Sequence, residues 1–172
     1  MGYQLTYPMR TSELAGALGL AWHGPDLDIS HVRSLHEVDS GALCFTKVSV
    51  NEALAVVGVV IAPPGTTPGR GAVIEANNPR LYFARALIAL NQSPGFATPV
   101  EEAAVAADAI VSPTAVLGRG VVIGPRTVIG HHVVIAYGVR IGADCIVKSN
   151  TVIGESGFGF ERDEDNIPVR LL

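Results

Sequence analysis

The sequence predicts a small α/β domain followed by a parallel β-helix, because the pattern of apolar residues changes near residue 100. Before that point, short apolar runs of helix and strand type alternate. After it, an aliphatic residue returns at every sixth position. A period of six fits neither a helix of 3.6 residues per turn nor an alternating strand, and it is typical of a solenoid. We therefore expect an α/β domain with its linker over 1–99 and a β-helix over 100–172.

The aliphatic position of the repeat is filled without a gap over eight hexapeptides. These residues are Val111, Leu117, Ile123, Ile129, Ile135, Ile141, Val147 and Ile153. In most repeats Gly or another small residue follows, where the backbone turns sharply and a larger side chain would be crowded. Each hexapeptide is thus expected to form one short strand and one turn, with the aliphatic side chain inside. A set of glycine-containing hairpins is the alternative, and the unbroken spacing disfavours it.

The first ninety residues carry the signals of strands and of a short helix. Thr11 or Ser12 is expected to cap that helix, which ends at Gly19. Apolar runs bounded by turn residues predict strands over 29–35, 42–46, 57–62 and 72–76.

Two more helices are predicted in the same domain. Ser49 and Glu52 form a candidate capping box for a helix through residue 55. Asn78 precedes a proline and predicts the start of a helix over 79–90. Together these elements make a small α/β domain of ordinary size.

Composition excludes several classes of function. Hydrophobic residues make up 48% of the chain and charged residues 16%, which indicates a globular protein. The net charge is −4 and Lys and Arg are not clustered, so nucleic-acid binding is not expected. Cys44 and Cys145 have no CxxC partner, which disfavours a zinc site and suits a reducing cytoplasm. No signal peptide is visible, and the apolar stretch 53–64 is too short for a membrane span.

Two short motifs resemble those of a known enzyme family. Residues 78–85 read Asn-Pro-Arg-Leu-Tyr-Phe-Ala-Arg, and residues 157–160 read Gly-Phe-Gly-Phe inside the hexapeptide array. With the order of the two domains, they resemble the UDP-3-O-(3-hydroxyacyl)glucosamine N-acyltransferases of lipid A biosynthesis over essentially all 172 residues. The resemblance implies a left-handed parallel β-helix in which three hexapeptides make one triangular coil.

The resemblance also implies an activity and an assembly. It implies a cytoplasmic homotrimer in which acyl-carrier protein delivers a 3-hydroxyacyl thioester to the amine of a UDP-linked acylated glucosamine. No metal or cofactor is implied, and a histidine of the β-helix is the general base. That histidine is expected after the Gly-Phe-Gly segment, beyond Leu172, so the family match assigns no catalytic residue within this chain. We expect the chain to lack the family's catalytic coils.

His131 and His132 are the candidates for catalysis within the chain itself. They directly follow Gly130, in the turn part of a hexapeptide, where polar side chains face solvent or a neighbouring subunit. A histidine has a pKa suited to taking a proton from an attacking amine. The alternative is a surface or subunit-interface role.

Four further residues are candidates for substrate binding. Phe45 matches an aromatic that the resembled family uses near uracil, and its alternative is a core position. Lys47 can meet a diphosphate or lie in solvent. Phe158 and Phe160 can line the path of the acyl group or pack against a neighbouring coil. The acidic run 161–165 is expected to be a solvated loop between hexapeptides.

Two other functions remain open at this point. One is an acetyl-CoA-dependent sugar acetyltransferase on the same β-helix, which the α/β domain at the front disfavours. The other is a non-catalytic trimeric module that binds a nucleotide sugar.

Overall fold

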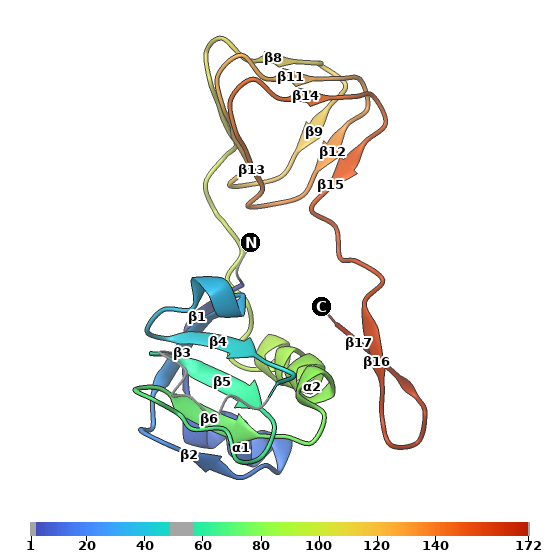
Figure 1. Cartoon of the computed structure of the whole chain (residues 1–172). Coiled ribbons are helices and arrows are strands. Elements are labelled where there is room, and N and C mark those ends of the chain that lie inside the picture. The colour runs from blue at the N-terminus through green and yellow to red at the C-terminus, as the bar shows by residue number, and fades with distance from the viewer. Residues whose placement is uncertain (1–2, 49–56, 172) are drawn as a thin grey trace. The chain divides into compact units, whose positions relative to one another are not determined.

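The computed structural model describes residues 3–48 and 57–171. The chain forms two compact units: unit 1 is Met1–Ala97 with Gly157–Leu172, and unit 2 is Thr98–Ser156 (Figure 1). We expected the β-helix to extend through Leu172, but the final segment clusters with unit 1. The reason lies in the hexapeptide period, since the next two aliphatic positions hold Gly159 and Asp165.

Unit 1 is built on a six-stranded sheet with the order β1-β3-β4-β5-β6-β2. Its strands are β1 (Gln4–Arg10), β2 (Trp22–His23), β3 (Asp28–Val32), β4 (Ala42–Phe45), β5 (Val59–Ala62) and β6 (Ala72–Glu75). The four strands β3 to β6 are parallel, and β1 and β2 are antiparallel strands at the edges. The helices are α1 (Thr11–Leu18) and α2 (Pro79–Gln92), with a short 3₁₀ turn at Leu35–Glu37.

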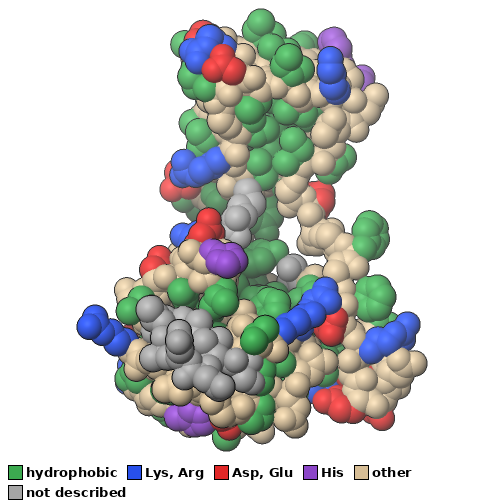
Figure 2. All heavy atoms as spheres, viewed as in Figure 1, with side chains coloured by type: hydrophobic (Ala, Val, Ile, Leu, Met, Phe, Trp, Pro, Cys, Tyr) green, Lys and Arg blue, Asp and Glu red, His purple; other side chains and the backbone are tan. Residues whose placement is uncertain are grey.

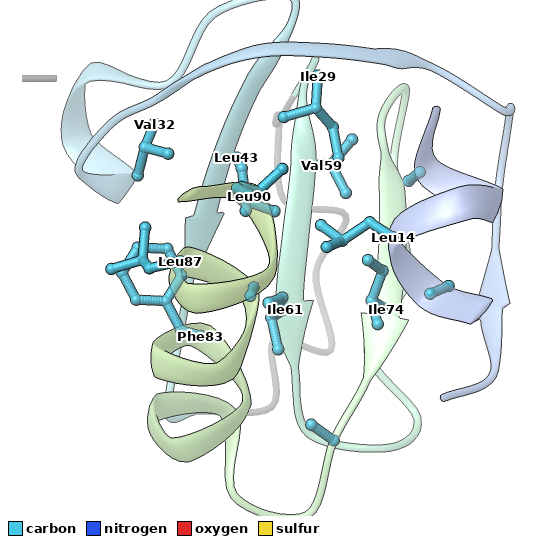
Figure 3. Packing of buried hydrophobic residues seen from close by; sticks show 14 of the residues in the cluster. Leu14, Ile29, Val32, Leu43, Val59, Ile61, Ile74, Phe83, Leu87 and Leu90 are labelled. Atoms are coloured by element: carbon cyan, nitrogen blue, oxygen red, sulfur yellow. The ribbon is translucent and has the colours of Figure 1, made fainter. Parts of the chain in front are cut away.

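The sheet of unit 1 is buried on both faces, as expected for parallel strands. Because successive side chains of a strand point to opposite faces, β4 and β5 each contribute to two clusters. Leu43, Val59 and Ile61 pack on one face against Leu14 of α1 and Leu90 of α2 (Figure 3). The opposite cluster is formed by Cys44, Val60, Ala62 and Val73.

Of the two described helices, the predicted start is confirmed for α2 and wrong for α1. The α2 start is confirmed, because the Leu81 amide donates to the Asn78 side chain at 3.2 Å. The predicted cap of α1 is wrong by one residue: the N-cap is Arg10. The Thr11 hydroxyl is instead used in a contact with Leu27. The helix expected near residues 49–55 lies outside the described residues.

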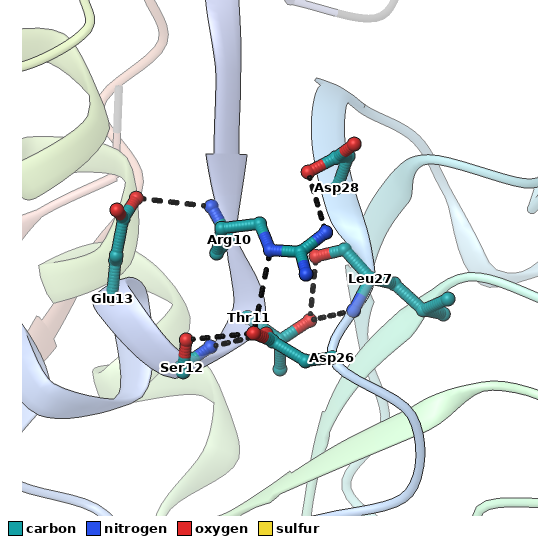
Figure 4. Close-up of polar contacts among 7 residues, drawn as sticks. All are labelled: Arg10, Thr11, Ser12, Glu13, Asp26, Leu27 and Asp28. Atoms are coloured by element: carbon teal, nitrogen blue, oxygen red, sulfur yellow. Dashed lines mark hydrogen bonds and ion pairs between the residues drawn. The ribbon is translucent and has the colours of Figure 1, made fainter.

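A polar network ties the start of α1 to the segment that leads into β3 (Figure 4). Asp26 accepts from the Ser12 amide and hydroxyl, each at 3.0 Å, and from the Arg10 guanidinium at 3.3 Å. Arg10 also pairs with Asp28 at 3.2 Å. The hydrogen bond from the Ser12 amide is the main reason that the pKa of Asp26 lies below its usual 3.8.

Unit 2 is a parallel β-helix of nine two-residue strands. They are β7 (Ala104–Val105), β8 (Ile110–Val111), β9 (Val116–Leu117), β10 (Val122–Ile123), β11 (Val128–Ile129), β12 (Val134–Ile135), β13 (Arg140–Ile141), β14 (Ile146–Val147) and β15 (Val152–Ile153). They form three sheets, β7-β10-β13, β8-β11-β14 and β9-β12-β15. Each strand pairs in parallel with the strand 18 residues away, so three hexapeptides make one coil.

The predicted interior of the hexapeptides is confirmed. Ile123, Ile129 and Ile135 of the middle coil are each 1% exposed, and they form one cluster along the axis. Four positions after the aliphatic residues, Val121, Val133, Val139 and the polar Thr127 are buried as well. Thr127 is accommodated because its hydroxyl donates to Gly142 O at 2.7 Å and accepts from the Cys145 amide.

Six consecutive turns of unit 2 bring the backbone into the left-handed region at the same point. The φ angles are positive at Gly120, Arg126, His132, Gly138, Asp144 and Asn150, which are six residues apart. Close stacking of coils explains why Gly follows the aliphatic residue. A Cβ added at Gly118 would lie 2.6 Å from the Tyr137 amide nitrogen of the next coil, too near for any side chain.

Gly118→Ala should therefore destabilise unit 2 by about 1–3 kcal/mol, the usual cost of overpacking. Gly142→Ala is the matched control, because a Cβ there meets nothing within 4 Å. We expect its effect to stay within about 0.5 kcal/mol. Urea unfolding of both variants measures the difference, and equal stabilities would contradict the close stacking of coils at Gly118.

Asp26→Asn should lower stability at neutral pH and flatten its dependence on acid. Because the native pKa of Asp26 is depressed, its contribution is complete above 3.8 and is lost as the pH falls through the lower native value. Thermal melting between pH 2 and pH 7 measures this, as the region below about pH 4 is where this carboxyl titrates. Asp165→Asn, an exposed carboxyl, serves as control, and parallel pH profiles for both variants would refute the role of Asp26.

Candidate functional site

The carboxyl ends of β4, β5 and β6 lie at one edge of the unit 1 sheet, because these strands run in parallel. Phe45 ends β4, and Thr46 and Lys47 follow it. After β5, Thr66 is 2% exposed and donates from its hydroxyl to Pro63 O at 2.7 Å. The edge therefore combines an aromatic, a cation and ordered hydroxyls.

The two uridine-site candidates differ in exposure. Phe45 is partly buried, and its ring lies 4.7 Å from that of Phe83 on α2, centroid to centroid. Phe45 thus borders the core without being fully buried. Lys47 is exposed, as both of its proposed roles require.

His131 and His132 both lie at the corner between the sheets β8-β11-β14 and β9-β12-β15, and both are exposed. The structure brings Ser112 and Thr114 of the preceding coil to this corner. Ser112 Oγ lies 2.8 Å from His131 Nδ1, and Thr114 Oγ1 lies 3.4 Å from the same atom. From the following coil, the Ser149 hydroxyl accepts from the His131 amide at 3.1 Å.

Sequence reasoning picked the histidines and missed these hydroxyl partners. The signal that could have found them is the coil length, since residues about 18 apart become neighbours once three hexapeptides make one coil. Ser149 lies 18 residues after His131, and Thr114 lies 18 residues before His132.

Phe158 and Phe160 lie at the return of the chain to unit 1. Phe158 is 97% exposed. Phe160 begins an antiparallel hairpin of β16 (Phe160–Arg162) and β17 (Pro168–Arg170), and it is 51% exposed. Both side chains are thus largely exposed, and their part in lining the path of the acyl group stays a prediction.

The acidic run 161–165 is held in this hairpin and not in a loop between hexapeptides. Glu161 accepts from Arg80 of α2 at 2.6 Å. Glu164 accepts from Arg85 of α2 in a bidentate pair at 2.7 and 3.2 Å, and this hydrogen bonding lowers the pKa of Glu164. Residues 78–85 therefore supply two arginines, Arg80 and Arg85, that fasten the hairpin to α2.

No three His, Cys, Asp or Glu side chains gather as metal ligands over residues 3–48 and 57–171. Burial raises the pKa of the Cys44 thiol to about 12, so this cysteine is a poor nucleophile. Neither described helix is long and apolar enough to cross a bilayer.

The repeats of unit 2 match a known protein family. Residues 120–155 match the bacterial transferase hexapeptide family (six repeats). The match covers 36 of the 172 residues, all within unit 2, and it supports a general acyltransferase-type role. No curated protein matches the chain.

The ion pair between Arg80 and Glu161 should stabilise the hairpin measurably. Its side chains are only 33% and 22% exposed, so a double-mutant cycle with Arg80→Gln and Glu161→Gln should give a coupling of about 1 kcal/mol. The matched pair is Arg85 with Glu164, where the carboxylate is 63% exposed and the coupling should be smaller.

Hydrogen exchange of the amides in β16 and β17 measures the local stability of the hairpin. Breaking the Arg80 pair should raise exchange in the hairpin and leave the coils of unit 2 unchanged. Equal protection of the hairpin in all variants would show that the two arginines do not hold it.

Proposed function

We propose that the chain belongs to an acyl-transfer system that moves a 3-hydroxyacyl group from acyl-carrier protein to the amine of a UDP-linked acylated glucosamine. The observation that carries the proposal is the three-sided stack of hexapeptide coils in unit 2, whose residues 120–155 match transferases. The α/β unit that precedes it, with the residue 78–85 motif on α2, supports the choice of a nucleotide-sugar acceptor over other acceptors. We expect the coils to wind left-handed, as in the resembled acyltransferases.

The edge formed by Phe45 and Lys47 is the proposed site for the uridine diphosphate group. Phe45 offers an aromatic face with its position fixed by Phe83, and such a face can stack on a base. Lys47 offers an exposed cation for the diphosphate.

The outer surfaces of unit 2 support assembly with further copies of the chain. On the sheet β8-β11-β14 the outward residues are Ile110, Val128 and Ile146, and on β9-β12-β15 they are Val116, Val134 and Val152. The outer members of these two faces are 57–68% exposed, and Figure 2 shows hydrophobic side chains gathered over unit 2. Flat apolar surfaces of this kind are typical of protein interfaces. We propose a homotrimer.

The full chain should bind UDP-N-acetylglucosamine, and Lys47→Ala should weaken binding about tenfold because a charge-assisted contact is lost. Lys148→Ala, an exposed lysine of unit 2, is the matched control. Isothermal titration measures both. Unchanged affinity in Lys47→Ala would contradict the proposed diphosphate contact.

Acyl transfer is tested with a UDP-linked 3-O-acylglucosamine and two thioester donors, 3-hydroxyacyl acyl-carrier protein and acetyl-CoA. If the chain transfers an acyl group, product should form only with the carrier-protein donor. Turnover with acetyl-CoA alone would identify a sugar acetyltransferase instead. Binding of the UDP sugar without transfer from either donor would identify a non-catalytic binding module.

A further inference from the structure

The hairpin of β16 and β17 has two faces of different chemistry (Figure 1). Residues directly opposite each other in an antiparallel pair share a face, so Phe160 lies beside Arg170, and Arg162 lies beside Pro168. Phe160 and Arg162 are two positions apart in β16 and therefore share that face. We call this side the outer face of the hairpin. The side chain of Glu161 lies on the opposite, inner face.

Three contacts within unit 1 fix which face of the hairpin points to solvent. On the inner face, Glu161 accepts from Arg80 of α2 at 2.6 Å. In the turn of the hairpin, Glu164 pairs with Arg85 of α2 at 2.7 Å. Directly after β17, Leu171 packs against the core cluster of unit 1. The inner face is thus held against α2, and all four side chains of the outer face are exposed.

The two arginines of the outer face have no carboxylate partner among the described residues. Arg170 forms no ion pair with any of them, and Arg162 donates to the backbone oxygen of Asn166 at 2.7 Å. The guanidinium carbon of Arg162 lies 5.9 Å from the ring centre of Phe160. The acidic side chains nearby are engaged by α2 or by amides of the turn: Glu161, Glu164 and Asp163. The outer face therefore presents two positive charges around one aromatic ring.

The chemistry of the outer face fits an acidic protein surface. Small ligands bind in concave sites that enclose them, whereas this face is an open two-stranded ribbon. The net charge of −4 disfavours nucleic acid as the partner. Arginine and aromatic side chains are enriched at protein interfaces, and guanidinium groups bind carboxylates through charge-assisted hydrogen bonds. Phe158, which is 97% exposed, adds apolar surface two residues before Phe160.

We propose that the outer face of the hairpin is the surface on which the acyl-carrier protein docks, with Arg162 and Arg170 binding its carboxylates and Phe160 an apolar side chain between them. The inference rests on the proposed function, in which this acidic carrier is the protein partner that supplies the acyl group. The exposed carboxylate of Asp165, in the turn, repels such a partner. The carrier therefore contacts the end of the hairpin away from the turn, where Phe160 pairs with Arg170.

Fluorescence anisotropy of labelled acyl-carrier protein, titrated with the full chain, measures this docking. Arg170→Glu should weaken binding about tenfold or more, because like charges then face each other. Asp165→Asn should instead tighten binding about twofold, because a repulsive charge is removed. Arg70→Glu, at an exposed arginine of unit 1 outside the hairpin, is the control and should stay within about twofold of the wild-type affinity. Circular dichroism and melting temperature verify that all three variants fold.

Two further readouts separate protein docking from binding of the carrier's phosphate-containing prosthetic arm. The carrier without this arm should bind about as tightly as the acylated carrier, because the contacts are with its protein surface. A photo-crosslinking phenylalanine analogue in place of Phe160 should link the chain to the carrier. The same analogue in place of Ile88, which is 36% exposed on α2, should not.

The outcomes for the inference and for the proposed function are distinct. Acyl transfer from the carrier, with equal carrier affinity in Arg170→Glu and the wild-type chain, would overturn the inference and leave the proposed function standing. Binding of the armed carrier alone would identify a site for a small phosphate ester and would also overturn the inference. Carrier binding that Arg170→Glu weakens, without transfer from either donor, would support the docking surface and count against the proposed activity. A wild-type chain that does not bind the carrier would overturn the inference together with the proposed donor.

Discussion

Stacking of coils at a spacing of 18 residues is the constraint on which unit 2 depends. Each strand has only two residues, too few to form a stable sheet within one coil, and each finds its partner in the next coil. The ladder fixes which side chains share the axis and which share a corner. It also brings backbones so close that the Gly118 position has no room for a Cβ. Interior, corners and flat faces follow from this one spacing.

The sequence predicted the interior of unit 2 well and its corners poorly. Ile123, Ile129 and Ile135 could be predicted as interior residues, because a local period of six indicates which side chain points inward. The contacts of His131 with Ser112 and Ser149 are different, because they join residues of different coils. They become visible only when the length of the coil is known. A histidine can thus be chosen from the sequence, whereas its hydrogen-bond partners require the three-dimensional register.

Unit 1 shows a similar limit. Its buried parallel strands and α2 were predicted from apolar runs and from Asn78, which are local signals. The cap of α1 was not, because Thr11 and Ser12 bind Leu27 and Asp26, partners in a later segment. The two-residue strand β2 gave no signal of its own. The hairpin of β16 and β17 also gave no local sequence signal, because its position on α2 depends on two arginines far away in the sequence.

The left-handed residue at each corner has a consequence for how such a chain changes in evolution. Insertions or deletions of a few residues inside a strand would shift every following aliphatic side chain out of the axis. Length can therefore change only by duplicating or losing whole coils, or by extending a corner outward. Corners already hold residues as different as Arg126, His132 and Asn150 in the same backbone conformation. New chemistry can thus arise there through single substitutions, with the scaffold left intact.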